Sequence, residues 1–266
     1  MAMLRLRARL PLHDMTLCVA HRGGSLLAPE NTLAAFDAGI AAGADWVECD
    51  VHRSRDGALI VLHDADLRRT TDRAGAVGTC TLAEIKQANA ASRFGGGNFP
   101  AQPIPTLEEV LQHVGARAGL QIEIKTPEQG TYPDIEERVL QAVNAHGFRD
   151  RSLMISFSAP VLGRCRAVDP DARTGLLISA RHQPGGSGTL GQRVAAEAHA
   201  CGASVVGLDY RLLSASLLAE LRGYGLGVAT WTVNEEADMR RCVGFDLEAV
   251  ASDRPDLLRK VLDDSR

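Results

Sequence analysis

Short runs of apolar and β-branched residues recur along the chain, and most are separated by segments with helical periodicity. These runs predict strands at 16–20, 46–50, 59–63, 120–125, 153–157, 174–179, 204–209 and 227–232. Apolar residues spaced for one helix face predict helices between them, for example over 32–42 and 134–146. Because strands that alternate with helices form parallel sheets, eight such strands predict an α/β fold of the (β/α)8 TIM-barrel type.

The connection after the third predicted strand departs from this rhythm. It runs from 64 to 105, which is long for a strand-to-helix link. It contains a helical piece at 82–91 and ends in a glycine- and proline-rich tail, FGGGNFPAQPIP. We therefore expect residues 1–266 to form a single catalytic domain, with a small inserted subdomain at about 64–105 over the barrel mouth.

Charge and composition narrow the class of partner. The chain has 29 Lys and Arg against 33 Asp and Glu, a formal net charge of −4, and only 4% aromatic residues. We expect a small-molecule substrate, no nucleic acid and no stable membrane association, while a homo-oligomer stays open. The six cysteines are scattered without a CxxC pair, which predicts reduced thiols. The basic N-terminus lacks the apolar run of a secretory signal, so a cytoplasmic protein is expected.

Charged residues lie where several predicted strands end. They are His21, Arg22, Glu48, Asp50, His63, Glu123 and Lys125, and Trp231 lies at the end of the last predicted strand. Side chains alternate faces along a strand, so Glu48 shares a face with Asp50, and Glu123 with Lys125. Because TIM-barrel active sites lie at the C-terminal ends of the strands, these positions predict one shared site. The residue types of this site are suited to metal-assisted chemistry on a phosphate group.

The acidic residues of this site predict a bound cation. Glu48, Asp50 and Glu123 would bring three carboxylates into one small volume, where they repel one another unless a cation lies among them. Oxygen-only ligation favours Mg²⁺ or Ca²⁺ over zinc, which prefers Cys and His. The alternative is that Glu48 or Asp50 caps a loop or forms an ion pair with a nearby arginine.

Two of the eight histidines differ from the rest in their position. His21 and His63 each lie where an apolar strand meets a polar loop. Because an imidazole titrates near neutrality, such a pair can act as general base and general acid on opposite sides of a phosphorus atom. The remaining histidines are interpreted as surface residues or as core residues with satisfied hydrogen bonds: His13, His52, His113, His146, His182 and His199.

Three further residues are candidates for substrate contacts. Arg22 and Lys125 carry the positive charge that would neutralise the non-bridging oxygens of a phosphate. The alternative for Arg22 is an internal salt bridge to one of the carboxylates. Trp231 is a candidate apolar wall for the carbon skeleton of a substrate, and its alternative is a core aromatic.

Several of these residues fall within recognisable motifs. The segments in question are HRGGSLLAPENTLAAF (21–36), VECDVHRSRDGALIVLHDADLRRTT (47–71), IPTLEEVL (104–111), IEIK (122–125), SF (156–157) and WTVN (231–234). In this order and at this spacing they resemble the glycerophosphodiester phosphodiesterase family over nearly the entire predicted barrel. The segment GFDLEAVASDRP (244–255) departs from the family pattern, since it is slightly longer and has Ser252 before Asp253.

The resemblance implies a barrel with an insertion after the third strand and hydrolysis of glycerophosphodiesters to glycerol 3-phosphate and an alcohol. The family's functional residues correspond by motif to metal ligands Glu48, Asp50 and Glu123, the catalytic pair His21 and His63, and the phosphate contacts Arg22 and Lys125. The metal, the leaving alcohol, the acid and base roles, and the choice of water or the glycerol 2-hydroxyl as nucleophile stay open.

Two other functions are compatible with the same residues. One is a phosphodiesterase for a lysophospholipid or a phosphoinositol diester, because only the walls of the pocket select the alcohol. The other is a phosphate-binding protein that has lost activity. That loss usually removes a histidine or a metal carboxylate, and all of them are present here.

Overall fold

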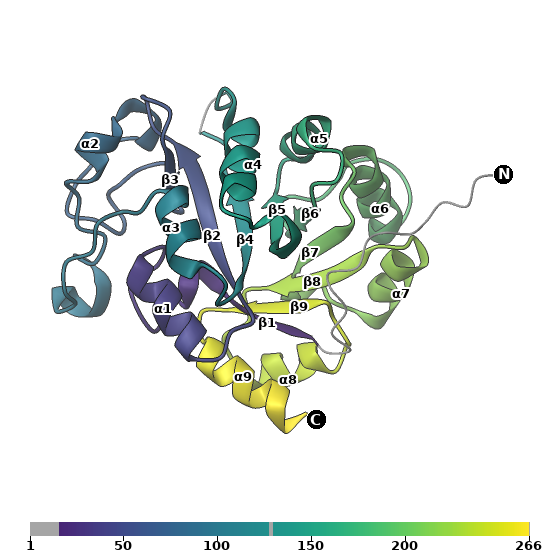
Figure 1. Cartoon of the computed structure of the whole chain (residues 1–266). Coiled ribbons are helices and arrows are strands. Elements are labelled where there is room, and N and C mark those ends of the chain that lie inside the picture. The colour runs from purple at the N-terminus through teal and green to yellow at the C-terminus, as the bar shows by residue number, and fades with distance from the viewer. Residues whose placement is uncertain (1–15, 128–129, 266) are drawn as a thin grey trace.

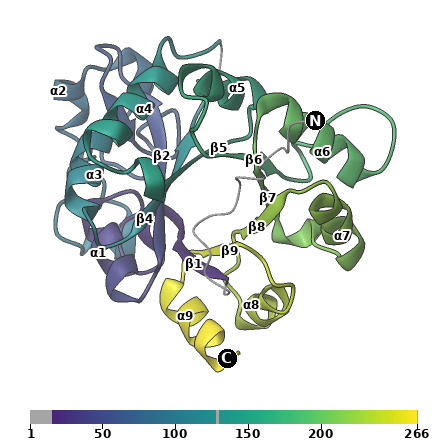
Figure 2. The same ribbon diagram turned by 45° about the vertical axis from the view of Figure 1, so that its right-hand side comes forward.

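The structure is a computed structural model that describes residues 16–127 and 130–265, so His13 and the basic N-terminal segment lie outside the described residues. Within these ranges, eight parallel strands close into a barrel (Figures 1 and 2). They are β1 (Leu17–Ala20), β2 (Trp46–Arg53), β4 (Gly119–Ile124), β5 (Ser152–Ser156), β6 (Thr174–Ile178), β7 (Val205–Asp209), β8 (Gly227–Trp231) and β9 (Ala249–Ser252). Each pairs with the next, and β1 pairs with both β2 and β9, which closes the barrel. The TIM-barrel prediction is confirmed.

The helices form a ring outside the strands (Figure 2). They are α1 (Leu33–Ala41), α3 (Leu107–Val114), α4 (Ile135–Ala145), α5 (Ala159–Val168), α6 (Leu190–Cys201), α7 (Ala215–Gly223), α8 (Glu236–Val243) and α9 (Pro255–Asp264). Short 3-10 turns occupy η1 (His21–Gly23), η2 (Val77–Thr79), η3 (Phe94–Gly97), η4 (Arg149–Arg151) and η5 (Tyr210–Leu212). None of the helices in the described part of the chain combines the length and the apolar run needed to cross a membrane.

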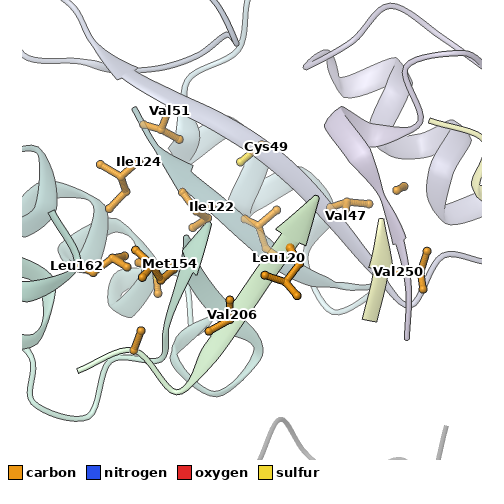
Figure 3. Close-up of a cluster of buried hydrophobic side chains, with 14 of the residues drawn as sticks. Val47, Cys49, Val51, Leu120, Ile122, Ile124, Met154, Leu162, Val206 and Val250 are labelled. Carbon is orange, nitrogen blue, oxygen red and sulfur yellow. The ribbon is translucent and has the colours of Figure 1, made fainter. Parts of the chain in front are cut away.

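The main hydrophobic core lies between the strands and the helices (Figure 3). Its members include Val47, Cys49 and Val51 of β2, Leu120, Ile122 and Ile124 of β4, and Leu162 of α5. Because neighbouring side chains on a strand point to opposite faces, these outward residues leave Glu48, Asp50 and Glu123 directed into the barrel. The alternation of the two strands therefore places the acidic residues at the site.

One predicted barrel strand lies outside the barrel. The segment predicted at 59–63 forms β3 (Leu59–Val61), which pairs antiparallel with β2. The link between them is the short turn at 54–58, where Gly57 has a φ of 92°. A parallel pairing needs a crossover of a dozen or more residues, so this short link permits only a hairpin. The predicted parallel strand is thus wrong.

The eighth barrel strand, β9, was absent from the predicted strands. It is only four residues long, and its small residues Ala249 and Ala251 face the barrel interior with the cluster that includes Trp46. Such a short run of small side chains carries little strand signal. Its place is decided by pairing with β1 and β8, which completes the barrel.

The long connection follows β3 in the chain and leads to α3. It contains η2, α2 (Leu82–Ile85) and η3, with a separate hydrophobic cluster that includes Val77 and Ile85. The helix predicted at 82–91 ends earlier, at Ile85. Asn89 accepts hydrogen bonds on its side-chain oxygen from the backbone N–H groups of Ala91 and Gln102. These local bonds compete with helical hydrogen bonds and turn the chain.

The start of α1 and the cysteines are both defined by local contacts. Thr32 is the N-cap of α1, where its hydroxyl oxygen accepts from the backbone N–H of Ala35 at 3.2 Å. All six cysteines are free thiols, and five of them are buried.

Candidate active site

Three carboxylates meet at the C-terminal end of the barrel. Asp50 and Glu123 are direct neighbours in the register of β2 and β4, and Glu48 lies two residues before Asp50 on the same face. One oxygen of each carboxylate lies within 4.8 Å of the others. Together these buried groups could hold a metal ion, as the pattern of the two strands predicts.

Asp50 is the most strongly supported anion of the three. Its Oδ2 accepts a hydrogen bond from the side-chain amide of Asn31 at 2.8 Å, and its backbone N–H donates to Asn31 Oδ1 at 3.2 Å. Lys125 Nζ lies 2.9 Å from Oδ1, and Arg22 Nε lies 3.5 Å from Oδ2. Burial alone would raise the pKa of Asp50, but the charges of Lys125 and Arg22 outweigh it and hold the pKa well below its usual range.

The other two carboxylates are destabilised as anions. Burial and then the charge of Asp50 raise the pKa of Glu48, although its Oε2 accepts from the backbone N–H of Arg22 at 2.8 Å. Burial also raises the pKa of Glu123, against the opposing charge of Lys125 at 2.8 Å. Asp50 Oδ1 is buried beside Lys125 Nζ at 2.9 Å, and this lysine is shared with Glu123. Carboxylate oxygens whose negative charge is not fully neutralised by neighbouring cations are suited to binding a hard divalent cation.

The His21 imidazole is positioned by the carboxylate of Asp253, which lies far from it in the chain. Its Nδ1 lies 2.7 Å from Asp253 Oδ1, and Asp253 also accepts from the Ser25 hydroxyl at 2.6 Å and the Asn234 amide at 2.7 Å. Because a carboxylate only accepts, Nδ1 carries a hydrogen and Nε2 faces the site, 4.0 Å from Glu48 Oε2. Burial lowers the pKa of His21, but Asp253 and Glu48 outweigh it, so the pKa is raised.

His63 reaches the same site by a different route. The hairpin of β2 and β3 returns the chain, so that Leu62 donates its backbone N–H to the carbonyl of Asp50 at 3.0 Å. His63 Nδ1 then lies 2.6 Å from Asp64 Oδ1, and Arg69 Nε donates to Asp64 Oδ2 at 2.6 Å. Burial lowers the pKa of His63, although the charge of Asp50 opposes it. The predicted proximity to Asp50 is therefore produced by a hairpin.

His52 forms a hydrogen bond with the backbone of His63. Its Nε2 lies 3.0 Å from the backbone carbonyl of His63, which requires a hydrogen on Nε2, while Nδ1 lies 2.9 Å from the Tyr132 hydroxyl and accepts from it. Burial lowers the pKa of His52 to about 4, so the ring is neutral. Both ring nitrogens are satisfied, as expected for a core histidine.

Arg22 and Trp231 border one cavity at the site, and Lys125 borders the wider groove beside it. Arg22 contacts Asp50 and also donates to Glu30 at 2.9 Å, which matches the salt-bridge alternative. Lys125 bridges two carboxylates and is 12% exposed, so it remains open to a ligand. Trp231 lines the cavity, and its indole N–H donates to the carbonyl of Gly207 at 2.9 Å. This bond fixes the position of the indole ring beside the cavity.

Comparison with known proteins places this arrangement in a family. Residues 21–257 match the model of the glycerophosphoryl diester phosphodiesterase family. The chain belongs to this family. A glycerophosphodiester phosphodiesterase of Bacillus subtilis is 34% identical over 262 residues, which covers 93% of this chain and 87% of that protein.

Solved structures of glycerophosphodiester phosphodiesterases share the fold. A crystal structure of such an enzyme from Agrobacterium tumefaciens has a TM-score of 0.78 at 28% identity and covers 92% of this chain and 100% of that one. A phosphodiesterase from Oleispira antarctica, solved in complex with the product sn-glycerol 3-phosphate, has a TM-score of 0.81 at 29% identity. The alignment covers 94% of this chain and 97% of that one.

In this member of the glycerophosphoryl diester phosphodiesterase family, several polar residues of the site escaped the sequence reasoning. Asn31 binds Asp50, Asp253 binds His21, and Arg69 binds Asp64, the carboxylate that contacts His63. Asn31, Arg69 and Asp253 lie inside segments quoted for the resemblance or its departure. A signal was therefore present for each, but no local pattern indicates which partner each one takes.

Proposed function

We propose that this protein is a metal-dependent glycerophosphodiester phosphodiesterase, which hydrolyses glycerophosphodiesters to sn-glycerol 3-phosphate and an alcohol. The observation that carries the proposal is the meeting of Glu48, Asp50 and Glu123 with two imidazoles that are each backed by a carboxylate. The product bound to the Oleispira antarctica relative agrees with this reaction.

In the proposed site, Glu48, Asp50 and Glu123 hold one divalent cation, Mg²⁺ or Ca²⁺. When bound, such an ion orients the phosphate and offsets the charge that builds on its oxygens. Arg22 and Lys125 contact the non-bridging oxygens, because both cations already border the carboxylates and retain some exposure. Trp231 forms an apolar wall beside the substrate's carbon skeleton.

His21 and His63 are the proposed proton carriers. Each ring has its Nδ1 engaged by a carboxylate, which leaves Nε2 as the nitrogen that can exchange a proton with the substrate. One histidine deprotonates the attacking hydroxyl group and the other protonates the leaving alcohol. Both also border the cavity that contains Glu48 and Glu123, so a phosphate there can be reached by both rings.

The proposal extends to the organisation of the chain. We treat residues 1–266 as one catalytic domain with an inserted subdomain at about 64–105, which has its own small apolar cluster. The expected setting is cytoplasmic, with a small-molecule substrate and no nucleic-acid partner. Arg69 of the connection contacts Asp64, so this region is linked directly to the proposed catalytic pair.

The test is the release of glycerol 3-phosphate from a panel of glycerophosphodiesters by metal-stripped protein titrated with Mg²⁺ or Ca²⁺. We expect metal-dependent release, and turnover lowered by about 10²–10⁴-fold in His21→Ala and in His63→Ala. Near-normal rates in both purified variants would contradict the two-histidine scheme. Binding of glycerol 3-phosphate without any turnover would instead indicate a binding protein.

A further inference from the structure

The candidate site continues inward as a small inner cavity along the barrel axis, which is partly open to the site. Its volume is about 190 Å³. One side carries Glu48, Gln121 and Glu123, and the opposite side is lined by small residues, including Gly207 and Ala229. An apolar cavity of about 150 Å³ can hold a ring the size of benzene, so this space is sufficient for a three-carbon arm.

Small and large residues alternate on the wall opposite the acidic strands. A Cβ added at Gly207 would lie 2.7 Å from Leu177 Cδ2 and 3.5 Å from Trp231 Nε1, so a larger residue there would collide with the packed wall. Ala229 and Ala251 are further small residues of this wall, on β8 and β9. The cavity is therefore bounded on this side by these small residues together with Leu177 and Trp231.

Gln121 is a polar residue of this cavity that the proposed reaction leaves unused. It follows Leu120 on β4, is the register partner of Glu48, and is only 7% exposed. Within residues 16–127 and 130–265, no group forms a hydrogen bond with its carboxamide. Its amide lines the cavity and can be reached from it, so it is suited to a ligand group that both donates and accepts.

We propose that Gln121 is a substrate-binding residue that hydrogen-bonds a hydroxyl group of the glycerol arm inside the barrel. This inference rests on the proposed function, since it assigns one arm of the glycerophosphodiester to the inner cavity. A hydroxyl group both donates and accepts, so either end of the amide can pair with it.

A second, wider space is available for the other arm of the diester. It measures about 860 Å³ and is lined by His52, Lys125, Arg164 and His182 among others. His63 and Glu123 border both this groove and the inner cavity, so a phosphate between the two spaces would lie beside them. The compact glycerol arm fits the smaller inner cavity, and alcohols of varied size fit the wider groove.

The experiment is calorimetric titration with excess Mg²⁺, using sn-glycerol 3-phosphate and inorganic phosphate as separate probes. The variants are Gln121→Leu and Gln121→Met, both of which remove the amide and keep most of the side-chain volume. The matched control is Gln112→Leu, the same change at an exposed position of α3. Thermal unfolding checks that each variant is folded.

We expect both Gln121 variants to bind glycerol 3-phosphate about tenfold more weakly, the scale of one buried hydrogen bond left unmade. Their affinity for inorganic phosphate should stay within about twofold of the unmodified protein, as should both affinities of the control. Unchanged binding of glycerol 3-phosphate, an equal loss for both probes, or no binding of glycerol 3-phosphate by the unmodified protein would each overturn the inference. Failure to cleave glycerophosphocholine with this binding pattern intact would overturn only the proposed function.

Discussion

The carboxylate that holds His21 offers the sharpest test of how this site is organised. Asp253→Asn preserves the shape of the side chain but removes its charge. The amide can also donate to Nδ1, which would place the ring hydrogen on Nε2 and invert the tautomer. Asp253 has a pKa lowered to about 2, because its bonds to His21, Ser25 and Asn234 outweigh burial, so the carboxylate is ionised at neutral pH.

The expected decrease in kcat follows from the loss of the charged hydrogen bond between His21 and Asp253. His21 Nδ1 and Asp253 Oδ1 are 2.7 Å apart, and each side chain is 17% exposed, so solvent screens this pair only partly. A hydrogen bond to a charged group contributes about 1.5–3 kcal/mol, which corresponds to roughly a 10- to 150-fold decrease in kcat. Loss of a carboxylate also destabilises the imidazolium, so the pKa of His21 should fall.

The assay is the pH–rate profile of glycerol 3-phosphate release for Asp253→Asn and for the control Asp256→Asn. Asp256 pairs with Arg254 at the surface, so the control removes a nearby charge without touching His21. We expect the decrease in kcat, with one limb of the profile moved to lower pH, in Asp253→Asn alone. A folded Asp253→Asn protein with kcat within about twofold of the unmodified enzyme would refute the positioning role.

Three further outcomes are expected. The pKa of His52 is about 4 in the fold and about 6.5 in an unfolded chain. The free energy of unfolding should therefore fall by roughly 3 kcal/mol as the pH is lowered from about 6.5 toward 4. In urea unfolding, His52→Gln should lose less stability over this pH range than the unmodified protein. Arg69→Gln should lower kcat by only about two- to tenfold, because Arg69 is 46% exposed, whereas Arg68→Gln should leave kcat unchanged. Because the pKa of Glu48 is raised, Mg²⁺ binding at neutral pH should release protons, and the affinity for Mg²⁺ should rise with pH. Calorimetry in buffers of different ionisation heat measures this release, and finding none would contradict the prediction.

The periodicity of apolar and polar residues was sufficient to predict those features that depend on a single strand or helix. The outward alternation of Val47 and Cys49 with Glu48 and Asp50 follows from the pleat of a single strand, so it could be predicted without any neighbour. The same reasoning failed for 59–63, because apolar content does not distinguish a parallel strand from an antiparallel one. The short turn containing Gly57 carried that information.

Which side chains pair across the barrel is decided at longer range. Asp253 is 232 residues from His21 in the chain and meets it only because β9 closes the barrel against β1. The sequence by itself determined the alternation of strands and helices and the inward face that carries the acids, since both follow from local geometry. The tertiary structure paired His21 with Asp253 and placed Gln121 at the cavity, since these positions depend on groups that only closure of the barrel brings together.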